Sequence, residues 1–150
     1  MRVWRIAGRR RTGLDGAGAR RAGGRWNSKG VAMVYASGTL SLAVLEKLVH
    51  LDPDVMPLGQ MVLEIELPDG LITAVAQRSL PRGWRRVPPI AATQRVGDDW
   101  VAAGTSAALA VPSAVVPTEL NYLFNPLHPE AKRIKVIRRR SFAFDPRLVR

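Results

Sequence analysis

The sequence is organised around Gly23-Gly24-Arg25-Trp26-Asn27, read together with the stretch Thr39–His50 that follows one apolar segment later. Two consecutive glycines let the backbone bend tightly and come close to a ligand. An arginine directly after them presents a planar fork of hydrogen-bond donors, which suits a phosphate group. Glu46 stands where a helix normally carries an apolar residue. An arginine and a misplaced carboxylate, close together in the sequence, therefore indicate a candidate site.

The clearest helical pattern covers Thr39–Leu51, where Ser37 or Thr39 is suited to cap the helix. Its apolar positions have the i, i+3, i+7 spacing of a buried stripe: Leu42, Leu45 and Val49. Glu46 lies at the edge of that stripe, and a carboxylate there has to be paired, protonated or functional. A salt bridge to one of the many arginines is the structural alternative. His50 lies one turn beyond Glu46, but no third ligand is evident, so no metal site is predicted.

The remaining elements follow from apolar alternation and from turn residues. Five stretches predict strands: Val3–Ala7, Val31–Ala36, Met61–Leu67, Ala107–Val111 and Lys132–Phe144. Leu71–Ala76 follows the turn Pro68-Asp69-Gly70, so it is expected to pair back on Met61–Leu67 as a hairpin. Thr93–Gly104 predicts a second helix, and the glycine-rich stretch Thr12–Gly24 predicts a flexible loop.

Length and composition favour one soluble domain over residues 1–150. Hydrophobic residues make up 47% of the chain, which is enough for a proper core. The chain contains no cysteine, which excludes disulfides, thiolate metal ligands and cysteine nucleophiles. No apolar run approaches the ~20 residues that span a bilayer, and the N-terminus has no signal-peptide pattern. We expect a cytoplasmic protein without membrane contact.

The net charge of +11 and the sequence pI near 11.5 point to an anionic partner. Three classes of partner fit this charge, namely nucleic acid, an anionic small ligand and an acidic protein surface. Aromatic residues amount to only 6% of the chain, so the interleaving of cations and aromatics that is typical of nucleic-acid binding is sparse. A basic nucleic-acid-binding module stays open as an alternative of another class.

Several single residues are further candidates for a site. Tyr35 lies near the end of a predicted strand just before a helix, where ligands are often bound. Ser113 follows an apolar strand and a proline, but the nucleophile pattern G-x-S-x-G is absent. Two interpretations of the Ser113 hydroxyl therefore stay open: it is a nucleophile, or it makes one hydrogen bond to a ligand. Asn121 and Asn125 are equally plausible as turn residues.

Together these stretches resemble the RES domain family. The matches run in the family's order along nearly the whole chain: Trp4-Arg5, Gly23-Gly24-Arg25-Trp26-Asn27, the strand that ends at Tyr35, Ala43-Val44-Leu45-Glu46, Leu80-Pro81-x-Gly83-Trp84, Gly97-Asp98-x-Trp100, Val111-Pro112-Ser113 and Asn121-Tyr122-x-x-Asn125-Pro126-x-His128. The family takes its name from an arginine, a glutamate and a serine, which map onto Arg25, Glu46 and Ser113.

The resemblance implies a single α+β domain with a split, mainly antiparallel sheet and flanking helices, similar to that of ADP-ribosyltransferase toxins. It implies the toxin half of a bacterial toxin–antitoxin pair, with an Xre-type helix-turn-helix antitoxin as partner. The family consumes NAD, either by glycohydrolase or phosphorylase cleavage that depletes NAD and arrests growth, or by ADP-ribosyl transfer to a host protein. The Arg–Tyr–Glu trio of such toxins corresponds to Arg25, Tyr35 and Glu46. A third alternative is a catalytically inactive binding protein, and the intact set of Arg25, Glu46 and Ser113 argues against it.

The chemistry of these residues agrees with NAD as substrate and needs no metal. Arg25 can hold the pyrophosphate, and Tyr35 can stack on the nicotinamide or its ribose. The nicotinamide ring of NAD is a cationic pyridinium and departs as a neutral molecule, so no general acid is needed. One carboxylate, Glu46, then suffices to stabilise the positive charge on the ribose. The set of NAD-binding residues that we expect is Arg25, Trp26, Asn27, Tyr35, Glu46, Ser113 and Asn121. Whether water, phosphate or a protein side chain accepts the ADP-ribose is left open.

Overall fold

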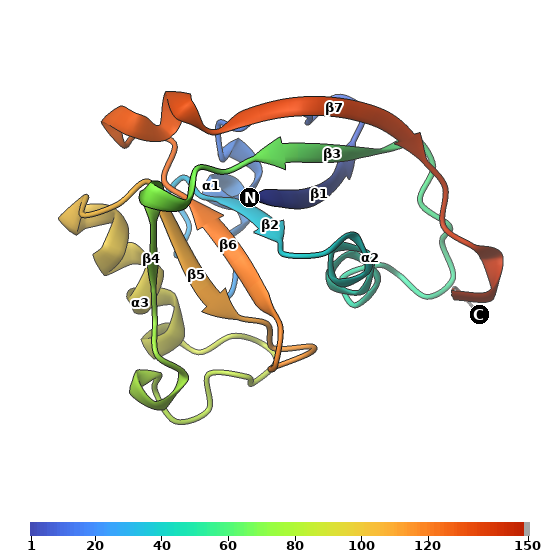
Figure 1. The fold of residues 1–150 in the computed structure, drawn as a ribbon. Helices are drawn as coiled ribbons and strands as arrows, with labels where there is room; N and C mark the ends of the chain where they lie inside the picture. Colours follow the sequence, from blue (N-terminus) through green and yellow to red (C-terminus); the bar gives the residue numbers. More distant parts are fainter. Residues whose placement is uncertain (149–150) are drawn as a thin grey trace.

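The chain folds around one sheet, with helices on one of its faces (Figure 1). The structure is a computed structural model, and it describes residues 1–148. Within them the strands are β1 (Arg2–Gly8), β2 (Val34–Ser37), β3 (Gln60–Glu66), β4 (Ile72–Ala74), β5 (Ala108–Pro112), β6 (Leu120–Phe124) and β7 (Lys135–Phe142). The α-helices are α1 (Ala17–Ala22), α2 (Leu40–Leu48) and α3 (Ala91–Ala103). Short 3-10 turns are η1 (Asp69–Leu71), η2 (Gln77–Ser79), η3 (Pro129–Arg133) and η4 (Pro146–Leu148).

The strand order is β4-β5-β6-β2-β1-β3-β7, and every neighbouring pair is antiparallel except β4 and β5. β1 and β2 are in register only at Trp4 and Ser37, whereas β1 and β3 pair along their whole length. The sheet is therefore split between β1 and β2 into two halves that diverge from this point (Figure 1). This confirms the expected α+β class with a split, mainly antiparallel sheet.

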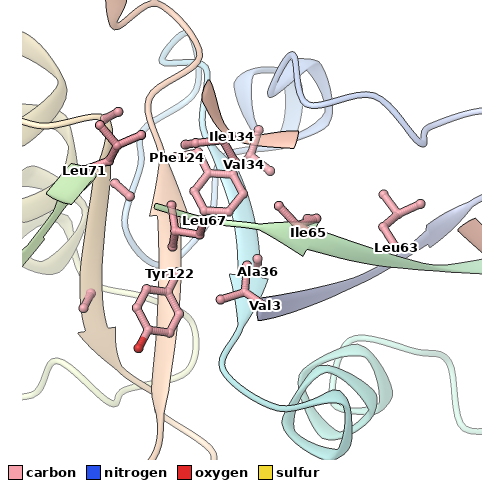
Figure 2. Packing of buried hydrophobic residues seen from close by; sticks show 13 residues of the cluster. Val3, Val34, Ala36, Leu63, Ile65, Leu67, Leu71, Tyr122, Phe124 and Ile134 are labelled. Carbon is pink, nitrogen blue, oxygen red and sulfur yellow. The ribbon is translucent and has the colours of Figure 1, made fainter. Parts of the chain in front are cut away.

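One face of the sheet carries the larger core cluster, which crosses the split (Figure 2). Its buried side chains come from both halves: Val3, Val34, Ala36, Leu63, Ile65, Leu67, Leu71, Ala107, Ala108, Ala110, Tyr122, Phe124 and Ile134. Val34 and Phe124 are opposite each other in register, and so are Ala36 and Tyr122. Because opposed residues of antiparallel strands point to the same face, these side chains form an apolar row on β2 and β6, and Val3, Leu63 and Ile65 extend the cluster into the other half.

The other face of the sheet carries two smaller core clusters, one under α3 and one under α2. α3 places Trp100 over Leu109, Val111 and Leu123 in one half of the sheet, and Trp26 belongs to the same cluster. α2 contributes Ala43 to a cluster with Ile6, Val62 and Phe144 in the other half. α3 therefore packs on one half of the sheet and α2 on the other. None of the helices within residues 1–148 is long and apolar enough to cross a membrane.

The expected hairpin between Met61–Leu67 and Leu71–Ala76 is wrong. Pro68-Asp69-Gly70 leads into the 3-10 turn η1, and β4 then pairs in parallel with β5 in the other half of the sheet. β3 instead lies between β1 and β7. A turn sequence fixes a change of direction, but the partner strand is chosen by the apolar surface that the strand covers.

Three further local predictions need correction. Leu45 and Val49 are 37% and 57% exposed, so the buried side of α2 is formed by Leu42 and Ala43 instead. The glycine-rich stretch Thr12–Gly24 contains the helix α1. Strand β6 was not anticipated, and β7 is shorter than Lys132–Phe144 because η3 occupies its expected start.

Candidate active site

Strand register brings several of the predicted residues to the helix-covered face of the sheet. Ser37 of β2 is opposite Asn121 of β6, and Asn121 is also opposite Val111 of β5. Ser113 follows two residues after Val111, and Tyr35 precedes Ser37 by two residues. Positions two apart on a strand share a face. Tyr35, Asn121 and Ser113 therefore meet on the face over which α2 carries Glu46.

The Glu46 carboxylate is held through one of its two oxygens. Its Oε1 accepts a hydrogen bond of 2.7 Å from the Ser113 hydroxyl and one of 2.6 Å from the Asn121 amide. The Asn121 carbonyl in turn accepts a bond of 2.8 Å from the Ser37 hydroxyl. Within residues 1–148 no hydrogen bond is made by Oε2, so this oxygen is free to meet a ligand. The alternative of an arginine salt bridge is not found within residues 1–148, where the side chains that donate to Glu46 are neutral.

Ser113 is fully buried, and all of its hydrogen-bonding capacity is used. The hydroxyl donates to Glu46 and accepts from the backbone N–H groups of Val115 and Val116, both at 3.0 Å. A serine hydroxyl has one proton and two lone pairs, and all three are engaged here. This arrangement favours the milder interpretation of Ser113, as a group that positions Glu46, over that of a nucleophile.

Arg25 lies at the other side of the site and is tied to the segment around Trp84. One of its terminal nitrogens, Nη1, donates to the carbonyl oxygens of Trp84 at 2.8 Å and of Arg86 at 2.9 Å. Burial lowers the pKa of Arg25, while the nearby Glu46 carboxylate acts in the opposite direction. An arginine stays charged in proteins, so its remaining donors are available to an anion.

Tyr35 and Asn27 hold the turn that carries Arg25. The Tyr35 hydroxyl donates to Asn27 Oδ1 at 2.6 Å and accepts from the backbone N–H of Trp26 at 3.0 Å. The Asn27 amide donates to the carbonyl oxygens of Ala19, Ser28 and Val31. Trp26 and Asn27 are 2% and 0% exposed, so their side chains lie inside the protein. Burial raises the pKa of the Tyr35 hydroxyl well above its usual range, which keeps it a donor.

Replacing Tyr35 with phenylalanine is expected to destabilise the protein by about 1–3 kcal/mol. The change leaves the buried Asn27 Oδ1 and the Trp26 N–H without their partner. The denaturant midpoint measures the effect. Tyr122→Phe is the matched control, since within residues 1–148 the Tyr122 hydroxyl makes no hydrogen bond. Equal midpoints for the two variants would contradict the assignment of Tyr35 to this network.

α3 contributes two side chains that the sequence did not reveal as functional. Asp98 accepts from the backbone N–H of Ser28 at 2.9 Å and from its hydroxyl at 2.6 Å. Gln94 donates to the carbonyl oxygens of Gly24 and Asn27. The two residues are one helical turn apart, so one side of α3 binds the backbone on either side of Arg25. The family motif Gly97-Asp98-x-Trp100 was the one sequence feature that pointed to Asp98, and it did not indicate what this residue does.

Arg5 is a further residue near the site that sequence reasoning did not single out. It follows Trp4, where β1 and β2 are in register, and its Nη1 donates to the carbonyl of Tyr35 at 3.1 Å across the split. Burial lowers the pKa of Arg5, and its Nε has no hydrogen-bond partner within residues 1–148. A buried guanidinium thus fixes the point from which the two halves of the sheet diverge. The motif match Trp4-Arg5 pointed to this residue without indicating its role.

The RES domain family matches residues 2–145 of the chain. The chain belongs to this family. The predicted recognition is thereby confirmed, whereas the assignment of the family's arginine, glutamate and serine to Arg25, Glu46 and Ser113 stays a prediction. Their individual roles stay predictions. Within the part of the chain that the structure describes, no group of three or more His, Cys, Asp or Glu side chains is arranged to hold a metal ion.

Characterised relatives match this RES domain over almost their whole length. A protein of Sphingobium named "Prs ADP-ribosylating toxin" is 43% identical over 98% of this chain and 96% of its own. Proteins named "Toxin Res" from Yersinia enterocolitica and Pseudomonas putida are 41% and 40% identical, and each alignment covers 99% of both chains.

A solved structure shares the fold. It is the crystal structure of the M. tuberculosis MbcT–MbcA toxin–antitoxin complex, in which one chain superposes with a TM-score of 0.74 at 17% identity. The match covers 95% of this chain and 84% of that one. At this level of identity the likeness shows a common fold.

Proposed function

We propose that this RES domain is the toxin of a bacterial toxin–antitoxin pair and that it cleaves the nicotinamide–ribose bond of NAD. The observation that carries the proposal is the Glu46 carboxylate, fixed through Oε1 by Ser113 and Asn121 with Oε2 free. Arg25 supplies a positive charge on the opposite side of the site. One cation and one preorganised carboxylate suit a substrate with an anionic pyrophosphate and a ribose that becomes positive.

In the proposed reaction the bond between ribose C1′ and the nicotinamide nitrogen breaks. Its electron pair moves to that nitrogen, so the cationic pyridinium leaves as neutral nicotinamide and the positive charge passes to the ribose. Glu46 stabilises this charge by electrostatic attraction, without transferring a proton. Ser113 and Asn121 act as positioning residues that hold the carboxylate in place, because their hydrogen bonds end on Oε1. Arg25 binds the pyrophosphate.

Trp26, Asn27 and Tyr35 contribute to NAD binding through the Arg25 turn. Their polar groups are already paired with one another and with the backbone, and Trp26 and Asn27 are buried. We assign the three residues to preorganising Arg25, and Tyr35 additionally lines the site from β2. A binding group that is ordered in advance loses less entropy when the substrate arrives.

ADP-ribosyl transfer to a protein is the second candidate for the same site. It is favoured by the relative of 43% identity that carries the name "Prs ADP-ribosylating toxin". Both reactions share the cleavage step and differ only in the nucleophile that attacks C1′. An antitoxin partner is supported by the toxin–antitoxin complex that shares the fold, and we propose one of the Xre type encoded beside the toxin. The proposed location is the cytoplasm, where NAD is available.

Release of nicotinamide from NAD by the purified protein tests the proposal. The reaction is run in plain buffer, with inorganic phosphate and with bacterial cell extract, and the products are separated by mass spectrometry. Free ADP-ribose identifies water as acceptor, a phosphorylated ADP-ribose identifies phosphate, and a protein carrying ADP-ribose identifies transfer. Folded protein that releases no nicotinamide in any arm would overturn the proposal. DNA or RNA binding that weakens steeply with salt would then favour the nucleic-acid alternative.

A further inference from the structure

A second arginine, Arg85, lies between the two sides of the candidate site. Arg25 donates to the carbonyl oxygens of Trp84 and Arg86, which directly flank Arg85 in the chain. The backbone of this segment is thereby fixed relative to Arg25. The position of Arg85 next to Arg25 is thus a consequence of the two hydrogen bonds that Arg25 donates to this segment.

The side chain of Arg85 reaches toward the Glu46 side of the site. Its Nε donates to the carbonyl oxygen of Ala114 at 3.1 Å, and Ala114 directly follows Ser113. Ser113 in turn donates to Glu46. The Arg85 guanidinium therefore ends beside the turn that holds the catalytic carboxylate. Within residues 1–148 its two terminal nitrogens make no hydrogen bond or ion pair, so their donors are free.

The charges around this position are unbalanced. Arg85 is close enough to Arg25 for the two guanidinium groups to repel each other, while Glu46 is the carboxylate that attracts Arg25. Two like charges that are held together by backbone contacts are unfavourable on their own. An anion bound between them relieves this repulsion, and a planar guanidinium is suited to phosphate oxygens.

We propose that Arg85 and Arg25 together bind the pyrophosphate of the substrate, with Arg85 as a second substrate-binding residue. A pyrophosphate carries one negative charge on each phosphate, which matches two separate guanidinium groups. This inference rests on the proposed function, since it assigns a residue to the same substrate. It also explains why the segment Trp84–Arg86 is tied to Arg25 in a chain with many other exposed arginines.

The experiment measures binding of two probes, ADP-ribose and adenosine, by calorimetry to the full chain. Adenosine lacks the pyrophosphate. Arg85→Ala is expected to weaken ADP-ribose binding by about ten-fold or more, because charge-assisted hydrogen bonds are lost. Adenosine binding stays unchanged. In turnover the KM for NAD rises, whereas kcat changes less, since the pyrophosphate does not take part in bond cleavage.

Arg82→Ala is the matched control. Arg82 is an exposed arginine three positions before Arg85, so Arg82→Ala has the same net charge as Arg85→Ala. Within residues 1–148 the Arg82 side chain makes no hydrogen bond or ion pair with a residue of the site. It is expected to bind ADP-ribose as the unmodified protein does, and Arg85→Lys is expected to recover part of the affinity. Arg85→Ala binding that equals that of Arg82→Ala, or an equal loss for both probes, would overturn the inference.

Arg25→Ala separates this inference from the proposed function. If Arg25→Ala loses ADP-ribose affinity and Arg85→Ala does not, the inference about Arg85 is wrong while the role of Arg25 stands. If Arg25→Ala keeps its ADP-ribose affinity, the pyrophosphate is bound elsewhere, and the proposed role of Arg25 fails with it.

Discussion

Glu46→Gln is expected to lower the rate of NAD cleavage by about 10²–10³-fold while the fold is retained. Glutamine has the shape of glutamate, and its carbonyl oxygen can still accept from Ser113 and Asn121 as Oε1 does. The amide nitrogen then replaces the free Oε2. The variant therefore keeps the hydrogen bonds to Ser113 and Asn121 and loses only the negative charge, which is the property that the proposed reaction requires.

The rate of nicotinamide release gives kcat, and the melting temperature shows whether the fold is intact. Glu119→Gln is the matched control, because Glu119 is a nearby carboxylate that accepts from the Thr39 hydroxyl at 3.2 Å and does not contact Glu46, Ser113 or Asn121 through its side chain. It is expected to keep the rate of the unmodified protein. If Glu46→Gln cleaves NAD at that same rate, the carboxylate is not the stabilising group and the site has been assigned wrongly.

The second large effect is expected at Gly97, where α3 packs on the turn that carries Arg25. A Cβ at this position would overlap the carbonyl oxygen of Trp26 and would lie 3.0 Å from Met33 Cε. The backbone cannot move away freely, since Asp98 and Gln94 hold Ser28, Gly24 and Asn27 from the same helix. Gly97→Ala is therefore expected to cost about 3 kcal/mol, at the upper end for overpacking of a core.

Thermal unfolding measures this effect, and a loss of about 6–12 °C in melting temperature is expected for a chain of this size. The kcat/KM for NAD should fall as well, because a displaced turn no longer presents Arg25 correctly. Gly18→Ala in α1 is the control, since nothing lies within 4 Å of a Cβ there and alanine favours a helix. If both variants melt at the same temperature, the close packing of α3 on the Trp26 backbone is not present in solution.

The two variants test different levels of the same site. Glu46→Gln removes a charge and leaves the hydrogen bonds, so its effect belongs to the chemical step. Gly97→Ala removes no polar group of the site and instead changes how closely α3 and the turn that carries Arg25 approach each other. A loss of activity in both would show that the charge and its geometry are each required.

Much of the fold was predictable from the sequence where local pattern and burial agree. β1, β3, β5 and both longer helices lie within a few residues of their predicted ranges, because period-2 and period-3.6 patterns report directly on which side is buried. The split sheet was an implication of the family resemblance, and it was not visible in any single pattern. Where the pattern was short, prediction failed: β4 was assigned to the wrong partner, and β6 was not anticipated.

The residues of the candidate site were predictable from the sequence, but the hydrogen bonds between them were not. Arg25, Glu46, Ser113 and Asn121 lie in the motifs that carry the family resemblance, and Tyr35 was identified from its position near a strand end. Their hydrogen-bond partners were not, since Glu46 meets a serine 67 positions away and an asparagine 75 positions away. Contacts over such separations depend on strand order, which a local pattern does not contain.

The sequence by itself therefore determined which chemistry is available: an arginine after two glycines, a carboxylate on a helix, and a chain of net charge +11 without cysteine. Only the tertiary structure decided what each group does. In the structure Ser113 donates its hydroxyl proton to Glu46, which favours a positioning role over that of a nucleophile. Trp26 and Asn27, which were expected to bind NAD, are buried in the turn that carries Arg25. The tertiary structure also brought Arg5, Arg85, Gln94 and Asp98 to the site. The physical reason is that a side chain's role depends on which donors and acceptors surround it, and the register of the split sheet fixes those neighbours.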